Sequence, residues 1–294
     1  PDRWDGAPVQ MDPRFIMPEA KSIIAFAFRV MRGSLRGIEE GTFFSNYSSM
    51  GYGGLNWLYM PMTMMNVAKY IEDYGYEAIP LGHLSPWRAI DNWGNLRENG
   101  NRPVEPGKPV PDVMVHLRIA AYLCGLGEIG WSKMFLTPQF GPRQRLAVMM
   151  TEAELEPDPI MEPYLCDRCM MCAKDCPGDC IPRDKSVKVN LAGNDVEWAD
   201  IDLQRCSVYF RAGEILEDGE KGEYMPGRDD VAPGPLSPFA RKPANVYTHG
   251  EGISGSIGCT RACMIHLEEQ GKLGNKFQTP FRRKPMWRVD WSAE

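Results

Sequence analysis

Eight of the nine cysteines of this chain lie between Cys166 and Cys263. Four of them form the run Cys166-Asp-Arg-Cys169-Met-Met-Cys172-Ala-Lys-Asp-Cys176-Pro177, with the spacing Cys-x2-Cys-x2-Cys-x3-Cys-Pro. Three thiolates separated by two residues each can wrap around one 4Fe–4S cubane, and a fourth thiolate before a proline binds the second cluster of a two-cluster protein. The run therefore predicts two 4Fe–4S clusters and electron-transfer chemistry.

A structural zinc site and a disulfide framework are the alternative uses of these cysteines. Zinc needs only four ligands in a closed tetrahedron, and disulfide frameworks suit small secreted domains. The three-plus-one spacing within a chain of 294 residues favours clusters over both alternatives.

Two clusters need eight ligands, so four more cysteines must contribute. The candidates are Cys180, Cys206, Cys259 and Cys263. The pseudo-symmetry of two-cluster ferredoxins predicts that Cys263 completes the first cluster and that Cys206 and Cys259 join Cys176 at the second. A regular second run would place a cysteine at Ser256, so Cys180 is the expected substitute. The alternative is that Cys180 is a buried thiol and the second cluster is 3Fe–4S or has a non-cysteine ligand.

The segments that precede this run predict an α/β layer that would position the chemistry. The apolar run at residues 21–28 is typical of a buried strand, and residues 59–74 have apolar side chains at helical spacing. Residues 77–81 and 146–151 are further strand candidates, and residues 113–123, directly after Asp112, form a second helix candidate. This order of strands and helices predicts a sheet covered by helices.

Composition and length set the domain organisation. With 43% hydrophobic and 24% charged residues the chain is globular, and we expect an α/β domain over residues 1–157 and a two-cluster ferredoxin-like domain with a C-terminal tail over residues 158–294. A net charge of −6 argues against a large nucleic-acid interface. The apolar stretches are too short for a transmembrane helix. Cytoplasmic residence is the simpler expectation, although an export signal before Pro1 could have been removed.

The motifs resemble one family. The stretch from Gly125 to Arg145, Gly-Leu-Gly-Glu-Ile-Gly-Trp-Ser-Lys-Met-Phe-Leu-Thr-Pro-Gln-Phe-Gly-Pro-Arg-Gln-Arg, is similar to the corrinoid-dependent reductive dehalogenases and the related epoxyqueuosine reductases. The ferredoxin run and Arg205-Cys206-Ser207 share this resemblance, which extends from about Lys21 to Lys272. The Gly-Leu-Gly-Glu and Phe-Gly-Pro-Arg elements look more like the dehalogenase branch.

The resemblance implies a base-off cobalamin or related corrinoid, held between a nitroreductase-like α/β domain and the ferredoxin-like module. The chain has no Asp-x-His-x-x-Gly sequence to supply a lower histidine ligand, which agrees with the base-off mode. The residues of the similar stretch that the resemblance places at the cofactor are Gly125, Gly127, Glu128 and Gly141.

Dehalogenases of this family pair a tyrosine proton donor with a nearby Arg or Lys. Arg143 and Arg145 match the family's basic element, with a solvated pair after a turn as the alternative. Tyr47 and Tyr52 lie in a glycine-rich segment that could approach a planar cofactor, with core aromatic residues as the alternative. Asp112 falls near the place of a catalytic aspartate in queuosine reductases, although the spacing and the flanking residues differ.

The sequence therefore predicts an anaerobic reductive dehalogenase that removes halide from a small organohalide. Its electrons would come from a low-potential donor such as a ferredoxin or flavodoxin. The alternatives are an epoxyqueuosine reductase-like enzyme acting on tRNA, which the acidity and the Gly-Leu-Gly-Glu form weigh against, and a non-catalytic electron-transfer protein. An electron-transfer protein with two clusters would not need the additional α/β domain.

Overall fold

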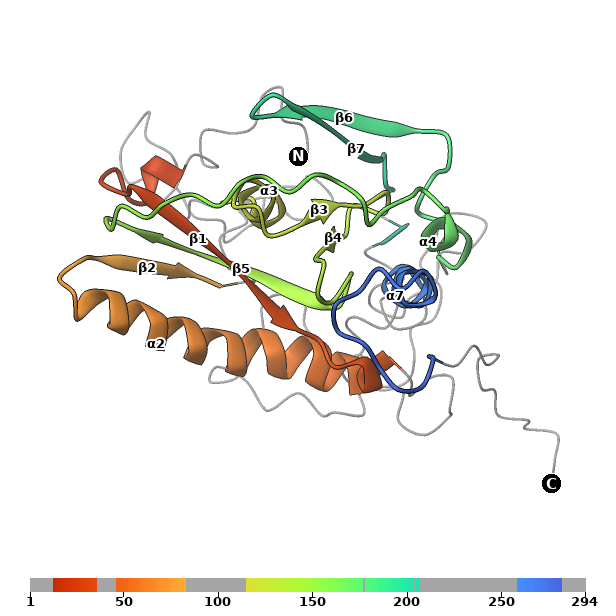
Figure 1. The fold of residues 1–294 in the computed structure, drawn as a ribbon, viewed down its shortest axis with the longest axis horizontal. Coiled ribbons are helices and arrows are strands. Elements are labelled where there is room, and N and C mark those ends of the chain that lie inside the picture. The colour runs from red at the N-terminus through yellow and green to blue at the C-terminus, as the bar shows by residue number, and fades with distance from the viewer. Residues whose placement is uncertain are drawn as a thin grey trace, which may run out of the picture.

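A three-stranded sheet forms the centre of the structure (Figure 1). The computed structural model describes residues 13–35, 46–82, 115–176, 178–202, 205–206 and 258–281. The strand order is β1 (Ser22–Arg29), β5 (Gln144–Thr151) and β2 (Ala78–Leu81). β5 lies in the middle and is antiparallel to both neighbours. The two edge strands therefore run in the same direction without pairing with each other.

Helices cover both faces of this sheet (Figure 1). A π-helical segment, η4 (Tyr47–Tyr59), continues directly into α2 (Met60–Glu72), which packs against β2 and β5. α3 (Leu117–Leu123) packs against β1 and β5. His116 is the N-cap residue of α3, and its Nδ1 accepts a hydrogen bond from the Ile119 N–H at 3.3 Å. This side chain satisfies one of the free backbone donors at the start of the helix.

The alternation of side chains along the strands divides the core into two halves. Phe28 of β1 and Met149 of β5 pack with Met60 of α2. Leu146 of β5 packs with Tyr122 of α3 on the other face. Both faces of the sheet are covered. The middle positions of β1 and β5 are therefore apolar on both faces, and their sequences do not alternate between apolar and polar residues.

Shorter elements extend the structure beyond the sheet. In chain order they are η2 (Pro13–Phe15), η3 (Arg32–Leu35), β3 (Glu128–Ile129), β4 (Phe135–Leu136), α4 (Met171–Lys174), β6 (Ser186–Leu191), β7 (Asn194–Ala199) and α7 (Cys259–Glu269). β3 pairs with β4 and β6 with β7, each pair antiparallel. α4 and α7 lie against each other beside the end of β5 (Figure 1).

The mixed α/β class predicted from the sequence is confirmed, and each predicted strand and helix is present within a few residues of its expected bounds. The division into two domains near residue 157 stays a prediction. Met264 and Ile265 of α7 pack in the same core cluster as Phe28 and Met60, so the C-terminal helix also contributes to the core of the sheet layer. Within the described residues, no helix has both the length and the apolar character needed to cross a bilayer.

Candidate functional site

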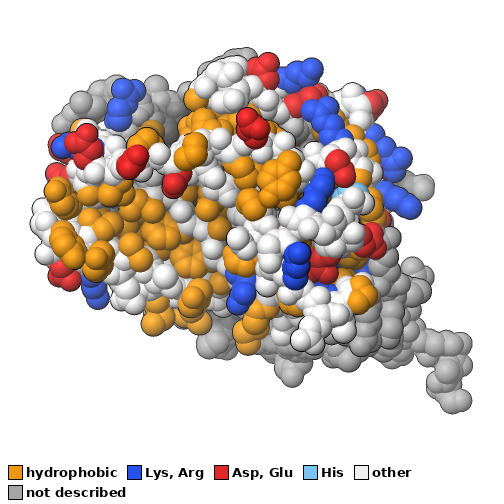
Figure 2. Space-filling view, viewed as in Figure 1, with side chains coloured by type: hydrophobic (Ala, Val, Ile, Leu, Met, Phe, Trp, Pro, Cys, Tyr) orange, Lys and Arg blue, Asp and Glu red, His pale blue; other side chains and the backbone are white. Residues whose placement is uncertain are grey.

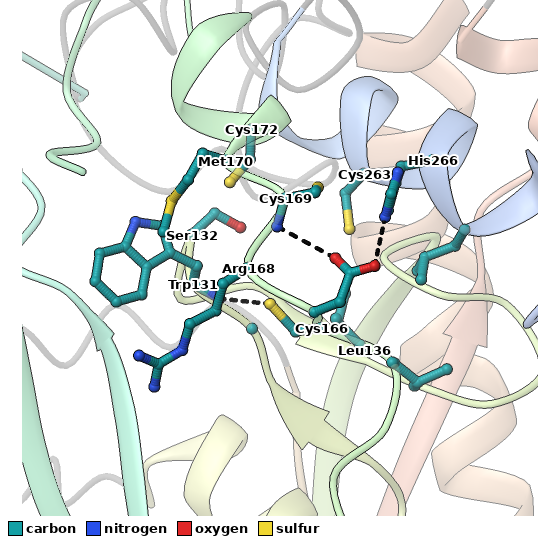
Figure 3. A pocket seen from close by; sticks show the side chains of 14 residues that line it. Trp131, Ser132, Leu136, Cys166, Arg168, Cys169, Met170, Cys172, Cys263 and His266 are labelled. Carbon is teal, nitrogen blue, oxygen red and sulfur yellow. Dashed lines mark hydrogen bonds and ion pairs between the residues drawn. The ribbon is translucent and has the colours of Figure 1, made fainter. Parts of the chain in front are cut away.

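Four cysteine side chains line one pocket between the loop that precedes α4 and the helix α7 (Figure 3). The loop and α4 supply Cys166, Cys169 and Cys172, and α7 supplies Cys263. The sequence predicted this grouping, including the distant Cys263. We refer to these four residues as the first thiol set.

The backbone of the loop is shaped so that three consecutive thiols reach one pocket. Arg168 and Met170 adopt left-handed conformations, with φ of 58° and 59°. Such a conformation costs a residue other than glycine about 1–2 kcal/mol. Backbone strain of this kind tends to occur at functional sites.

A second group contains Cys176, Cys180, Cys206 and Cys259, which we call the second thiol set. The Cys180 side chain lies within hydrogen-bonding reach of the thiols of both Cys176 and Cys206, and the Cys180 N–H donates to the Cys176 Sγ at 3.4 Å. Burial, together with the nearby Cys206 and Cys176, raises the pKa of the Cys259 thiol to about 12. Cys180 therefore lies where the sequence analysis needed a fourth ligand.

Both sets have the chemistry of a cluster site. Burial, followed by the nearby Cys166 and Cys169, raises the pKa of the Cys172 thiol to about 11, and burial likewise raises that of Cys263. Buried thiolates that repel one another require a cationic partner. Four thiols per site is the number that a 4Fe–4S cluster uses. The donor sets thus fit two such clusters, with α7 supplying one cysteine to each.

Glu128 anchors the start of the first-set loop. Its Oε2 accepts hydrogen bonds from the N–H groups of Tyr164 (2.7 Å) and Leu165 (3.0 Å), and its Oε1 accepts one from Cys166 (2.6 Å). The side chain is only 3% exposed. A buried carboxylate is tolerated when such donors satisfy it. Glu128 therefore positions Cys166, and the contact with a cofactor that the resemblance implied for it stays a prediction.

Asp167 links the same loop to α7. Its Oδ1 accepts the Cys169 N–H at 3.2 Å, and its Oδ2 lies 2.8 Å from His266 Nε2 and 3.6 Å from Lys272 Nζ. Burial alone would raise the pKa of Asp167, but the hydrogen bond and charge of His266, with the charge of Lys272, hold it below its usual range. The carboxylate thus stays charged and ties the ends of the first thiol set together.

A separate polar cluster lies between η4 and β5. Arg145 Nη2 donates a hydrogen bond of 2.7 Å to the Tyr47 hydroxyl, and the guanidinium carbon lies 4.5 Å from the centre of the Tyr52 ring. Tyr47 and Tyr52 are five residues apart, which places them on successive turns of the π-helical segment. The structure therefore brings three predicted catalytic residues together. A guanidinium in this position stabilises negative charge on the phenolic oxygen.

Arg143 has different partners. Its Nη1 donates to the Val30 carbonyl and its Nη2 to Asn275 Oδ1, both at 2.8 Å. The side chain is 1% exposed, and burial lowers its pKa to about 10. The alternative of a solvated arginine pair is therefore wrong. These two hydrogen bonds hold the segment after α7 against the end of β1, and the catalytic role of Arg143 stays a prediction.

The predicted cofactor glycines are surrounded closely by the chain itself. A Cβ atom on Gly127 would lie 2.0 Å from the Leu136 carbonyl oxygen, and one on Gly125 (φ +71°) would lie 2.2 Å from that of Pro159. Gly141 has φ of +58° and faces Leu267. These contacts account for the glycines without a ligand. Asp112 lies outside the described residues.

Comparison with known proteins supports the resemblance. A tetrachloroethene reductive dehalogenase of Dehalobacter restrictus is 27% identical over 205 residues, which cover 65% of this chain and 30% of that protein. One from Desulfitobacterium hafniense is 26% identical over 205 residues, with the same coverage. The chain is similar in sequence to reductive dehalogenases. It spans about 30% of the length of these curated relatives, and no family model matches it.

The matching solved structures include a reductive dehalogenase and an epoxyqueuosine reductase. A catabolic reductive dehalogenase has a TM-score of 0.45 and 18% sequence identity, over 84% of this chain and 30% of that chain. An epoxyqueuosine reductase from Streptococcus thermophilus has a TM-score of 0.40 and 14% identity, over 87% of this chain and 65% of that chain.

Several residues of this dehalogenase-like chain escaped the sequence analysis. Asp167 lies inside the cysteine run, and His266 lies one helical turn after Cys263, so their spacing could have revealed them. Trp131 and Ser132 lie in the stretch that resembles dehalogenases and line the first-set pocket. No sequence pattern marked Asn56. Its side chain is notable only because it is buried and has no hydrogen-bond partner among the described residues.

Proposed function

We propose that this chain forms the catalytic part of a reductive dehalogenase that removes halide from an organohalide by means of a corrinoid and two iron–sulfur clusters. The proximity of Arg145 to Tyr47 carries the proposal, since it pairs a proton donor with a cation in a chain that also contains two thiol sets. The sequence similarity to tetrachloroethene reductive dehalogenases supports it.

The two thiol sets would hold the clusters, which supply single electrons at low potential. Polar atoms of η4 and β5 suggest a place for a polar cofactor. Asn56 is 3% exposed, and neither of its side-chain polar atoms has a partner among the described residues. The buried Nε of Arg145 is also unpaired there. Because buried polar groups are normally satisfied, the peripheral amides of a corrinoid fit these atoms.

The reaction requires two electrons and one proton: the carbon–halogen bond breaks, a carbon–hydrogen bond forms, and halide leaves. A bound corrinoid supplies the two-electron reduction. We assign the proton to the Tyr47 hydroxyl. Arg145 stabilises the phenolate that remains after proton transfer, and the buried position of both tyrosines excludes competing water.

An external donor would deliver electrons at the first thiol set. Cys169 is exposed, whereas Cys172 is buried, so this set is open to solvent on one side. Arg168 next to it has a side chain that is 52% exposed. Figure 2 shows Lys and Arg side chains, with Asp and Glu side chains among them, over the part of the surface where β6, β7, α4 and α7 lie. We assign this side of the protein to the docking of a low-potential donor such as a ferredoxin or flavodoxin.

The test is anaerobic purification with cobalamin supplied, followed by measurement of iron, sulfide and cobalt per chain. Chloride release is then measured by ion chromatography, with tetrachloroethene as the probe and reduced methyl viologen as the donor. We expect about eight irons and one cobalt per chain, together with chloride release that stops when the donor is omitted. The Cys124→Ala variant is the control, because Cys124 belongs to neither thiol set and its Sγ donates to the Ile23 carbonyl.

Other outcomes point to other functions. Eight irons without cobalt would favour an electron carrier and contradict the proposal. Bound cobalt without halide release from tetrachloroethene or 3-bromo-4-hydroxybenzoic acid would also contradict it. Reduction of an epoxyqueuosine-containing tRNA stem loop by that same preparation would then identify an epoxyqueuosine reductase.

A further inference from the structure

The tight turn between β3 and β4 reaches into the first thiol set (Figure 3). The Trp131 N–H donates a hydrogen bond of 3.3 Å to the Sγ of Cys166. The next residue, Ser132, is 9% exposed and lines the same pocket, where its hydroxyl lies within reach of the Cys172 thiol. Two consecutive residues of one turn therefore approach the sulfur atoms of two cysteines in the set.

The turn is held rigidly by the elements around it. The Trp131 carbonyl accepts the Ala199 N–H from β7 at 2.8 Å, and the Trp131 indole N–H donates to the Pro182 carbonyl at 2.9 Å. On the other side of the turn, the Thr260 hydroxyl of α7 contacts the Met134 Sδ at 3.2 Å. These three contacts fix the position of the turn. The Trp131 N–H and the Ser132 hydroxyl are therefore preorganised beside the first thiol set.

We propose that Ser132, assisted by the Trp131 N–H, tunes the reduction potential of the cluster held by the first thiol set. This inference rests on the proposed function, because it requires a cluster at that set. When a cluster accepts one electron, its negative charge increases while no bond breaks and no proton needs to move. Hydrogen bonds to the ligand sulfurs stabilise the added charge, so they favour the reduced form and raise the potential.

Ser132 places a hydrogen-bond donor beside the sulfur atoms of the first thiol set. It takes no part in the bond-breaking step. The neighbouring glycine allows the close approach: a Cβ atom on Gly130 would lie 3.6 Å from the Cys166 Sγ and 3.0 Å from the Leu136 side chain. The turn and the loop thus pack closely enough for direct hydrogen bonds to sulfur. The second thiol set lies outside the pocket that Ser132 lines, so its cluster serves as an internal reference.

The experiment is a redox titration of the iron-loaded protein, followed by electron paramagnetic resonance, in the native chain and in Ser132→Ala and Ser132→Thr variants. In Ser132→Ala we expect the ratio of reduced to oxidised form of one cluster at a fixed potential to fall about tenfold, which is about 59 mV for one electron. The other cluster should not shift. Ser132→Thr keeps the hydroxyl, so it should restore most of the native potential.

Equal potentials in the native chain and Ser132→Ala would overturn the inference, as would equal shifts in both variants. If Ser132→Ala does not retain iron, the native protein still decides the question. Exchange into D2O should then produce a deuterium hyperfine coupling from the hydroxyl at the reduced first-set cluster, and absence of any such coupling would overturn the inference. A native protein without iron would instead refute the proposed function.

Discussion

Two buried charged residues show how this protein stabilises charged side chains in its interior. Glu128 and Arg143 are both almost fully buried. Backbone N–H groups satisfy the Glu128 carboxylate, whereas Arg143 donates to one backbone carbonyl and one amide side chain, and its Nε has no partner among the described residues. A buried charge without such partners would be very costly. Their partners are far away in the sequence, so each residue also fixes one chain segment against another.

Replacement of Glu128 tests this anchoring. In Glu128→Gln, one carboxylate oxygen becomes an NH2 group that cannot accept a hydrogen bond from a backbone N–H. We expect a loss of about 1–3 kcal/mol in the free energy of unfolding, which is the usual cost of a buried donor without a partner. Urea denaturation measures this loss, and iron per chain should fall with it. A variant as stable as the native protein would show that the three hydrogen bonds do not hold the loop.

The Tyr47 hydroxyl is the expected proton donor. Tyr47→Phe removes that proton and should lower the rate of halide release about 10²- to 10⁴-fold, the usual contribution of a general acid. The rate at which dithionite reduces the clusters, followed by stopped-flow absorbance, should stay the same. Tyr76→Phe is the matched control, because Tyr76 is an exposed tyrosine away from Arg145. Equal rates in both variants would assign the proton to another group.

At the scale of elements, the β3–β4 pair and α7 act as supports for the first thiol set. β3 provides Glu128, and the turn after it provides Trp131 and Ser132. α7 has two functions, because Cys259 and Cys263 belong to the thiol sets while Met264 and Ile265 pack in the core of the sheet. Movement of either element would therefore change the geometry of the cysteines.

Close packing of β3 against β4 can be tested at Gly127. A Cβ atom there would lie 2.0 Å from the Leu136 carbonyl oxygen, so the backbone of the pair would have to separate. We expect Gly127→Ala to lose about 3 kcal/mol or more, the upper range for overpacked sites. The control is Gly33→Ala, because a Cβ atom at Gly33 meets no heavy atom within 4 Å. Thermal denaturation should separate the variants, and similar melting temperatures would contradict the packing argument.

The link between the cysteine loop and α7 should depend on pH. The folded pKa of Asp167 is below its unfolded value of about 3.9. Its contribution to stability is thus complete above the unfolded pKa and disappears as the pH falls through the folded pKa. Asp167→Asn lacks this titration, so its stability should fall less than that of the native chain when the pH is lowered below about 4. Urea denaturation of the metal-free proteins at a series of pH values measures the difference. Parallel curves would show that the Asp167 link adds nothing.

Across the whole molecule, the cysteines bring the helix α7 together with segments that precede it in the chain. Because α7 supplies one thiol to each set, clusters bound there would join α7 to the loop, and removal of their iron would leave neutral thiols without those bonds. The sheet has its own apolar core on both faces.

Removal of iron by an anaerobic chelator should therefore affect the molecule unevenly. We expect amide hydrogen exchange to become faster in α7 and in the loop from Cys166 to Cys180, while β5 keeps its protection. Mass spectrometry of peptides from both regions measures this, and reconstitution with iron and sulfide should restore the protection. Equally rapid exchange in β5 would show that the sheet also depends on the clusters.

Local spacing and periodicity in the sequence determined much of this picture. The cysteine run predicts three thiols of one set because neighbouring residues on one loop cannot move far apart. The strand at 22–29 and the helix at 60–72 follow from apolar patterns that span only a few residues. The partnership of Cys263 with the first set followed from the pseudo-symmetry of two-cluster ferredoxins, and the structure places it there.

Only the tertiary structure decided which arginine faces the tyrosines. Arg143 and Arg145 are two residues apart and chemically identical, so nothing local distinguishes them. Arg143 binds Val30 and Asn275, which are 113 and 132 residues away, whereas Arg145 reaches Tyr47 across 98 residues. The burial that gives Glu128, Ser132 and Asn56 their importance is likewise created by contacts between distant segments, and such contacts arise only when the chain folds.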